Sequence, residues 1–166
     1  MTNKIYLAGG CFWGVAEYYR RLKGIESTVV GYAQGHTENP TYREVCTQAT
    51  NHTETVEVIY HPDEISLEKV LEHFFRMIDP TSLNRQGNDV GTQYRSGIYS
   101  EDDDELETIK EIVSSYQVHY RAPIVVEVEK LKNFYVAEIE HQDYLVKNPS
   151  GYCHIDFSLI KKEELK

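Results

Sequence analysis

Cys11 is the residue of this chain whose type and setting most favour chemistry. It stands in the run Gly10-Cys11-Phe12-Trp13-Gly14, between the strand-like run Lys4-Ile5-Tyr6-Leu7-Ala8 and a stretch with helical apolar periodicity. This placement predicts a cysteine at the first turn of a helix, where free backbone N–H groups and the helix dipole stabilise an anion. Such a thiol is a nucleophile whose pKa is lowered from about 8.5 into roughly the 3.5–7.5 range. The alternative is a buried structural cysteine.

Five other side chains could assist a reactive thiol. They are Tyr42 after the turn Asn39-Pro40-Thr41, Glu54 at the start of a strand-like run, Asp89 and Tyr94 in the segment 87–96, and Cys153 near the C-terminus. Taken singly, each residue could also have a purely structural role: Glu54 as a surface carboxylate, Asp89 as a turn former and the tyrosines as packing residues. Cys46 lies in an amphipathic segment and is interpreted as a buried structural thiol.

Composition excludes several classes of function. The 166 residues carry a net charge of −10, which disfavours nucleic acid or an anionic membrane as the main partner. The sequence contains no apolar run of membrane-spanning length and no signal-peptide core, so we expect a cytoplasmic protein. Cysteines at positions 11, 46 and 153 are too scattered for a zinc finger, and the acidic run 101–105 is typical of a solvated helix start. We therefore do not expect a metal site.

The elements that must position these residues alternate along the chain. Strands are predicted at 4–8, 25–35 with interruptions at Gly31 and Gly35, 54–60, 93–99, 124–128 and 134–137. Helices are predicted at 12–22, at 41–47, from the N-cap Ser66 to residue 78, from the N-cap Ser100 to about residue 116, and at 138–146. Residues 81–91 read as a loop.

The interleaving of strands and helices predicts the fold class. We expect an α+β fold with a mixed, mainly antiparallel sheet covered by helices, in a ferredoxin-like two-layer sandwich. Residues 1–166 are expected to form a single domain with a loop-rich tail from about 148 to 166. The tail ends in a charged Lys/Glu run that we expect to fray.

The candidate residues together resemble the peptide methionine sulfoxide reductases of the A type. Gly10-Cys11-Phe12-Trp13-Gly14 is similar to the nucleophile motif of that family. Asn39-Pro40-Thr41-Tyr42, His52-Thr53-Glu54 and the run 89–96 follow in the family's order and spacing, and the resemblance continues through 141–145 and 151–153. It thus covers nearly the whole chain. Gln34 stands where a glycine is usual, and Asn51 and Thr53 replace small residues around His52.

The resemblance implies a role for each candidate residue. Cys11 would attack the sulfur of a methionine sulfoxide, free or in an oxidised protein, while Glu54 protonates the sulfoxide oxygen. Tyr42 and Tyr94 would donate hydrogen bonds to that oxygen, and Asp89 would orient the network. Phe12 and Trp13 would form an apolar wall for the substrate methyl group, which selects the S epimer. The product on Cys11 is a sulfenic acid.

The resemblance also implies how the enzyme is recycled. Cys153 would condense with the sulfenic acid on Cys11, carried there by Gly151 and a loose tail. Thioredoxin would then reduce the resulting disulfide, so that no bound cofactor is needed.

Two other functions are compatible with a reactive thiol. One is a cysteine-dependent acyl transferase or hydrolase in which His36, His52 or His141 acts as the base. The other is a non-catalytic module that binds oxidised methionine in partner proteins. Replacing Glu54 by Gln should disable a reductase, whereas a hydrolase would instead depend on one indispensable histidine. Replacing Cys11 by Ser should leave binding intact if the protein is a non-catalytic module.

Overall fold

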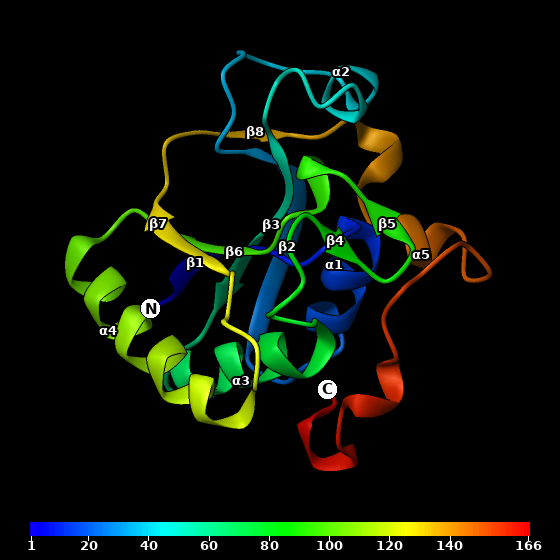
Figure 1. Cartoon of the computed structure of the whole chain (residues 1–166). Helices are drawn as coiled ribbons and strands as arrows, with labels where there is room; N and C mark the ends of the chain where they lie inside the picture. The colour runs from blue at the N-terminus through cyan, green and yellow to red at the C-terminus, as the bar shows by residue number, and fades with distance from the viewer.

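The structure, a computed structural model, describes residues 1–166 and is built around a six-stranded sheet (Figure 1). The strands are β1 (Asn3–Ala8), β2 (Ile25–Ala33), β3 (Thr53–Tyr60), β4 (Arg85–Gln86), β5 (Asp89–Val90), β6 (Gly97–Ser100), β7 (Glu127–Lys130) and β8 (Phe134–Val136). The α-helices are α1 (Phe12–Arg20), α2 (Tyr42–Cys46), α3 (Leu67–Met77), α4 (Asp103–Tyr116) and α5 (Tyr144–Lys147). Five short 3-10 helices complete the secondary structure.

The centre of the sheet confirms the predicted fold class. The strands run in the order β7-β6-β1-β3-β2-β8. Its inner part, β6-β1-β3-β2, is antiparallel throughout, and α1 and α3 supply the two crossovers of a βαββαβ unit. β8 adds an antiparallel strand beside β2, whereas β7 pairs in parallel with β6. The sheet is therefore mixed and mainly antiparallel, as expected.

Alternation along the strands separates the two faces of the sheet. Ile5 and Leu7 of β1 belong to the main core, which also contains the apolar faces of α1 and α3. Tyr6 and Ala8 point to the other face, where they pack with Tyr99 in a small second cluster. The helices thus form one layer on the sheet, and the opposite face carries only a small cluster. No helix combines the length and the apolar composition that a membrane crossing requires.

Most predicted elements are present, but several boundaries differ. β2 continues through Gly31, which pairs with both β3 and β8. A Cβ at this position would lie 2.5 Å from the carbonyl oxygen of Tyr135, so the glycine permits the close approach of β8. The strand predicted from Gln93 begins only at Gly97, since Thr92–Tyr94 form a 3-10 turn. The strand predicted at 124–128 is shifted to β7, and the helix at 138–146 is divided into a 3-10 turn and α5. The loop 81–91 contains the small β4–β5 hairpin.

The helix caps are set by short polar side chains. The Ser66 hydroxyl accepts a hydrogen bond from the Lys69 N–H and caps α3, as predicted. The N-cap of α4 is Asp102 rather than Ser100, because the Asp102 carboxylate accepts from two backbone N–H groups of the first turn. Ser100 instead accepts from the Asp102 N–H and donates to Glu105 at 2.7 Å.

The C-terminal tail is docked on the protein, so the prediction that its charged end frays is wrong. It descends from α5 to the C-terminus near α1 and α3, drawn from orange to red in Figure 1. Ile155 and Ile160 are buried in the main core. Leu165 forms a β-bridge with Leu22, and Glu164 makes ion pairs with side chains of α3.

Candidate active site

Cys11 is the N-cap residue of α1, as the sequence predicts. Gly10 has a φ of +91°, a conformation open to glycine, and this turns the chain from β1 into the helix. The predicted lowering of the thiol pKa is wrong. Cys11 is 8% exposed, and burial raises its pKa well above the ordinary value, with the nearby Glu54 carboxylate adding to the rise. A hydrogen bond from the Trp13 backbone N–H at the helix start opposes the rise without outweighing it.

Glu54 is a buried carboxyl group beside this thiol. It is 1% exposed on β3, and the backbone N–H of Phe12 donates a hydrogen bond of 3.2 Å to its Oε1. Its Oε2 has no hydrogen-bond partner. Burial raises the pKa of Glu54 to about 8, and the charge of Asp89 adds to the rise. The group is therefore a carboxylic acid at neutral pH, with one oxygen free to donate.

Tyr42 and Tyr94 lie next to each other, within electrostatic range of this acid. Burial raises the pKa of both hydroxyls, and the charge of Glu54 is the next cause for each. Tyr42 begins α2, where a capping box between Thr41 and Glu44 fixes the turn before it. Tyr94 ends the 3-10 turn that precedes β6. Both phenols stay protonated near neutral pH and can donate hydrogen bonds.

Asp89 lies at the start of β5 and reaches the tail. Its carboxylate accepts a hydrogen bond of 3.1 Å from the Tyr152 hydroxyl, and it lies 3.9 Å from His154 Nδ1. Its negative charge raises the pKa of both Glu54 and Cys11. Asp89 therefore lies within electrostatic range of the central pair and joins it to the tail.

An aromatic cluster adjoins the thiol. The Phe12 ring is 1% exposed and packs on Tyr32 and His141, with centroids 5.7 and 5.6 Å away. The Trp13 ring is half-buried, stacks on Tyr144 at 3.8 Å, and donates its N–H to His141 Nδ1 at 3.1 Å. The two aromatic residues of the nucleophile motif thus differ, since Phe12 lies in the core and Trp13 keeps an exposed part.

The tail brings a second thiol to the same turn. A Cβ added to Gly14 would lie 2.8 Å from Cys153 Sγ, so the Cys153 thiol lies against the first turn of α1. His154 donates a hydrogen bond of 2.9 Å from Nε2 to the carbonyl of Gly9. All three cysteines are free. The structure thus brings together all of the candidates: Cys11, Glu54, Tyr42, Tyr94, Asp89, Cys153, Phe12 and Trp13.

The sequence alone did not indicate all the residues of this cluster. His141 holds Trp13, and Tyr144 covers one face of the indole. Cys46 is half-buried rather than buried, and its thiol hydrogen-bonds with Tyr42. The resemblance at 141–145 could have indicated the first two, whereas nothing in the sequence links Cys46 to the tyrosine.

The departures from the family pattern have local explanations. Gln34 and Asn51 have φ values of +64° and +57°, the left-handed region where glycine is least strained. Gln34 is held there by its side chain, which accepts from the Lys132 N–H at 2.6 Å. The Thr53 hydroxyl lies 2.9 Å from the Arg95 carbonyl. None of these residues replaces a member of the cluster.

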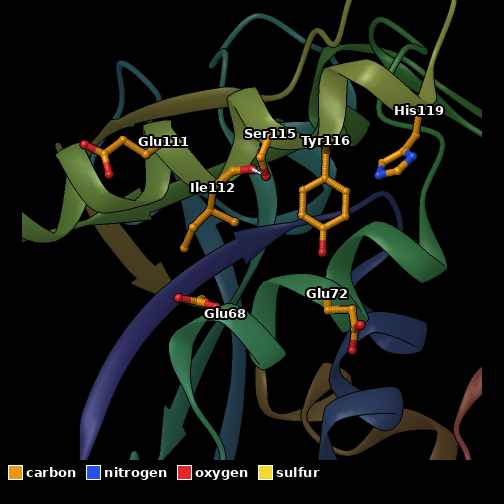
Figure 2. A pocket seen from close by; sticks show the side chains of 7 residues that line it. All are labelled: Glu68, Glu72, Glu111, Ile112, Ser115, Tyr116 and His119. Carbon is orange, nitrogen blue, oxygen red and sulfur yellow. Dashed lines mark hydrogen bonds between the residues drawn. The ribbon is translucent and has the colours of Figure 1, made fainter.

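A separate cleft lies between α3 and α4. Figure 2 shows Glu68 and Glu72 of α3 on one wall and Glu111, Ile112, Ser115 and Tyr116 of α4 on the other, with His119 at one end. Its volume is about 560 Å³. It contains no thiol and none of the candidate residues, so the chemistry of Cys11 takes place elsewhere.

Comparison with known proteins shows the family to which the chain is related. The family model described as "Peptide methionine sulfoxide reductase" matches residues 3–166. A protein named peptide methionine sulfoxide reductase MsrA from Ureaplasma parvum serovar 3 is 53% identical over 163 residues, covering 98% of this chain and 99% of that one. Methionine sulfoxide reductase A of Corynebacterium diphtheriae has a similar structure, with a TM-score of 0.87, 42% identity, and coverage of 92% of this chain and 77% of that one. Mxr1 from Saccharomyces cerevisiae in complex with Trx2 matches with a TM-score of 0.60 and 29% identity, covering 86% of this chain and 84% of that one.

Proposed function

The chain belongs to the peptide methionine sulfoxide reductase family, and from this premise we propose the residues that carry out its reaction. The protein is an oxidoreductase that reduces methionine sulfoxide to methionine with electrons from thioredoxin. In our proposal Cys11 is the nucleophile, Glu54 the general acid and Cys153 the resolving thiol. Residues 1–166 act as one reductase domain, with free and protein-bound methionine sulfoxide as substrates. The three free thiols suit a reducing compartment such as the cytoplasm.

The first step transfers oxygen from the substrate to Cys11. Cys11 Sγ attacks the sulfoxide sulfur while Glu54 gives its proton to the sulfoxide oxygen. The hydroxyl group then moves from the substrate sulfur to Cys11 Sγ, so that the substrate S–O bond and the new S–S bond both break as the Sγ–O bond forms. Methionine leaves as the thioether, and Cys11 becomes a sulfenic acid. The thiol proton of Cys11 returns to Glu54, so protons balance and no free thiolate has to persist in the buried site.

One observation supports this assignment above the others. Glu54 is buried, its pKa is raised to about 8, and its Oε2 has no partner within the protein. A carboxyl group of that kind can donate a proton at neutral pH, and an oxygen left without a partner keeps its hydrogen-bonding capacity for a substrate atom. The neighbouring tyrosines Tyr42 and Tyr94 donate hydrogen bonds to the sulfoxide oxygen as charge develops on it. Asp89 orients this network.

The hydrolase alternative requires a histidine base hydrogen-bonded to the Cys11 thiol, and none of His36, His52 and His141 makes such a bond. His52 Nε2 lies 2.8 Å from the Thr37 carbonyl, and His141 Nδ1 accepts from Trp13. Neither makes a hydrogen bond to Cys11.

The second step resolves the sulfenic acid. The Cys153 thiol attacks Cys11 Sγ, a disulfide forms and water leaves with the oxygen. A thioredoxin dithiol then reduces the disulfide and restores both thiols. The contact between Cys153 and Gly14 supports the choice of Cys153 over Cys46.

The aromatic wall selects the substrate epimer. Trp13 offers its exposed part to the methyl group, and Phe12 forms the floor beneath it. Because Glu54 and the tyrosines fix the oxygen on another side, only one arrangement of methyl, oxygen and lone pair fits. We assign the S epimer.

The test uses separate R and S epimers of a blocked methionine sulfoxide with dithiothreitol as the reductant. We expect methionine to form from the S epimer alone, at a rate that Cys11→Ser abolishes. If neither epimer is reduced, the assignment of the reaction is wrong. If both epimers are reduced equally, the proposal that the aromatic wall of Phe12 and Trp13 selects the epimer is wrong. In a thioredoxin-driven assay, Cys153→Ser should stop after one turnover. Continued turnover would transfer the resolving role to Cys46 or to thioredoxin itself.

A further inference from the structure

The tail after Cys153 runs along α1 in the opposite direction and is fixed at both of its ends. At the start of the helix, His154 Nε2 donates to the Gly9 carbonyl at 2.9 Å. Beyond the end of the helix, the Lys166 N–H donates to the Arg21 carbonyl at 2.9 Å, and Leu165 forms the bridge to Leu22. The position of Cys153 along α1 is therefore set by contacts at the far end of the tail as well as by its immediate neighbours.

Glu164 is the strongest of those far contacts. Its carboxylate forms a bidentate ion pair with Arg76 of α3, with distances of 2.8 Å to Nη1 and 3.0 Å to Nη2. Lys69 Nζ lies 2.9 Å from Oε2, and the Lys161 N–H donates to Oε1 at 2.8 Å. The Glu164 side chain is 10% exposed, so water screens these interactions less than it screens a surface pair.

The same carboxylate is linked to the helix that carries Cys11. His73 Nε2 lies 3.6 Å from Glu164 Oε2, and His73 Nδ1 lies 2.8 Å from the hydroxyl of Tyr18 in α1. The backbone carbonyl of Glu164 accepts from the Lys23 N–H at 2.9 Å, just beyond that helix. The tail end, α3 and α1 thus form one connected cluster around Glu164.

We propose that Glu164 is a positioning residue for the resolving step, an inference that rests on the proposed role of Cys153. By fixing the tail along α1, Glu164 keeps the Cys153 thiol against the turn that carries Cys11. The reaction it assists is the condensation of the Cys153 thiol with the Cys11 sulfenic acid, which forms the disulfide and releases water. Glu164 takes no part in the oxygen transfer, because it lies at the other end of α1.

The size of the effect follows from effective concentration. A docked tail presents Cys153 at a fixed place, whereas a tail held only at Lys147 samples many positions. Ile155 and Ile160 still pack in the core without Glu164, so the loss is partial. We expect disulfide formation to slow by about tenfold.

The experiment separates the two chemical steps in a single turnover. Reduced enzyme is mixed with one equivalent of S-methionine sulfoxide without reductant. Methionine release reports the first step, and alkylation of the remaining thiols followed by mass spectrometry reports disulfide formation. Dimedone trapping measures the sulfenic acid between them. The variants are Glu164→Gln, Glu164→Asp and the matched control Glu163→Gln, which removes an exposed charge from the same turn.

The expected pattern is specific to positioning. Glu164→Gln should release methionine at the unaltered rate, form the disulfide about tenfold more slowly and accumulate sulfenic acid. Glu164→Asp should recover most of the disulfide rate, and Glu163→Gln should match the parent. Disulfide formation at the parent rate in Glu164→Gln, or equal slowing of both steps, overturns the inference.

Failure of the proposed function gives a different result. In that case Cys153→Ser would leave disulfide formation or thioredoxin-driven turnover intact, whatever Glu164→Gln does.

Discussion

Replacing Glu54 by Gln should stabilise the protein while it disables the enzyme. The raised pKa of Glu54, about 8 against an ordinary 4.5, means that the folded protein binds a proton that the unfolded chain releases. A raised pKa contributes stability that is complete below pH 4.5 and is lost as pH rises through 8. Each pH unit between these values lowers the free energy of unfolding by about 1.4 kcal/mol.

This slope gives a definite magnitude. Between pH 5 and pH 7.5 the Glu54 carboxyl should lower the free energy of unfolding by about 3 kcal/mol, allowing for partial titration at each limit. A Gln side chain keeps the Phe12 hydrogen bond and cannot ionise. The free energy of unfolding of the Gln variant, relative to that of the parent, should therefore rise by about 3 kcal/mol between pH 5 and pH 7.5. The other titrating groups are the same in both proteins, so their contributions cancel in this comparison.

The assay is urea denaturation of both proteins at pH 5 and pH 7.5, under reducing conditions and with Glu163→Gln as an exposed-charge control. The control should show the pH dependence of the parent. A stability difference between Glu54→Gln and the parent that does not change with pH would refute a buried, protonated Glu54. The same variant should form methionine about 10²–10⁴-fold more slowly, the range for loss of a general acid.

Three further substitutions test the site. Tyr42→Phe and Tyr94→Phe should each lower the kcat for methionine formation by about 10–100-fold with a smaller change in KM, because their hydrogen bonds strengthen as the oxygen gains charge; an effect confined to KM would contradict this. Gly14→Ala should slow disulfide formation by about fivefold or more in the single-turnover assay, because its Cβ would lie 2.8 Å from Cys153 Sγ. An unchanged rate would show that Cys153 reaches Cys11 by another path.

The elements that the sequence predicted well have strong periodic patterns. α3 has an apolar stripe and a serine cap, and β3 alternates over its length, so local residues specify both. Ile124–Val126 have equal strand propensity but do not pair, because β6 offers only four residues and pairs with Glu127–Lys130. The position of this strand was therefore decided by the length of its pairing partner β6, which lies far away in the sequence.

The same distinction applies to the site. The position of Cys11 at a helix start follows from adjacent residues, and this part was predictable. The rise in its pKa depends on burial and on Glu54, which the fold brings from another strand. The docking of the tail depends on Arg76 and Lys69, two surface-type residues of an amphipathic helix that no local pattern links to Glu164.

The order of the strands also bears on aggregation. The nine-residue β2 and the eight-residue β3 lie inside the sheet, whereas the edge strands β7 and β8 have four and three residues. An exposed edge is where another chain can add a strand, and short or charged edges disfavour such pairing. Three of the four residues of β7 are charged: Glu127, Glu129 and Lys130. The strands β7 and β8 themselves therefore offer a second copy little backbone to extend, although β8 covers only Gly31–Ala33 of β2.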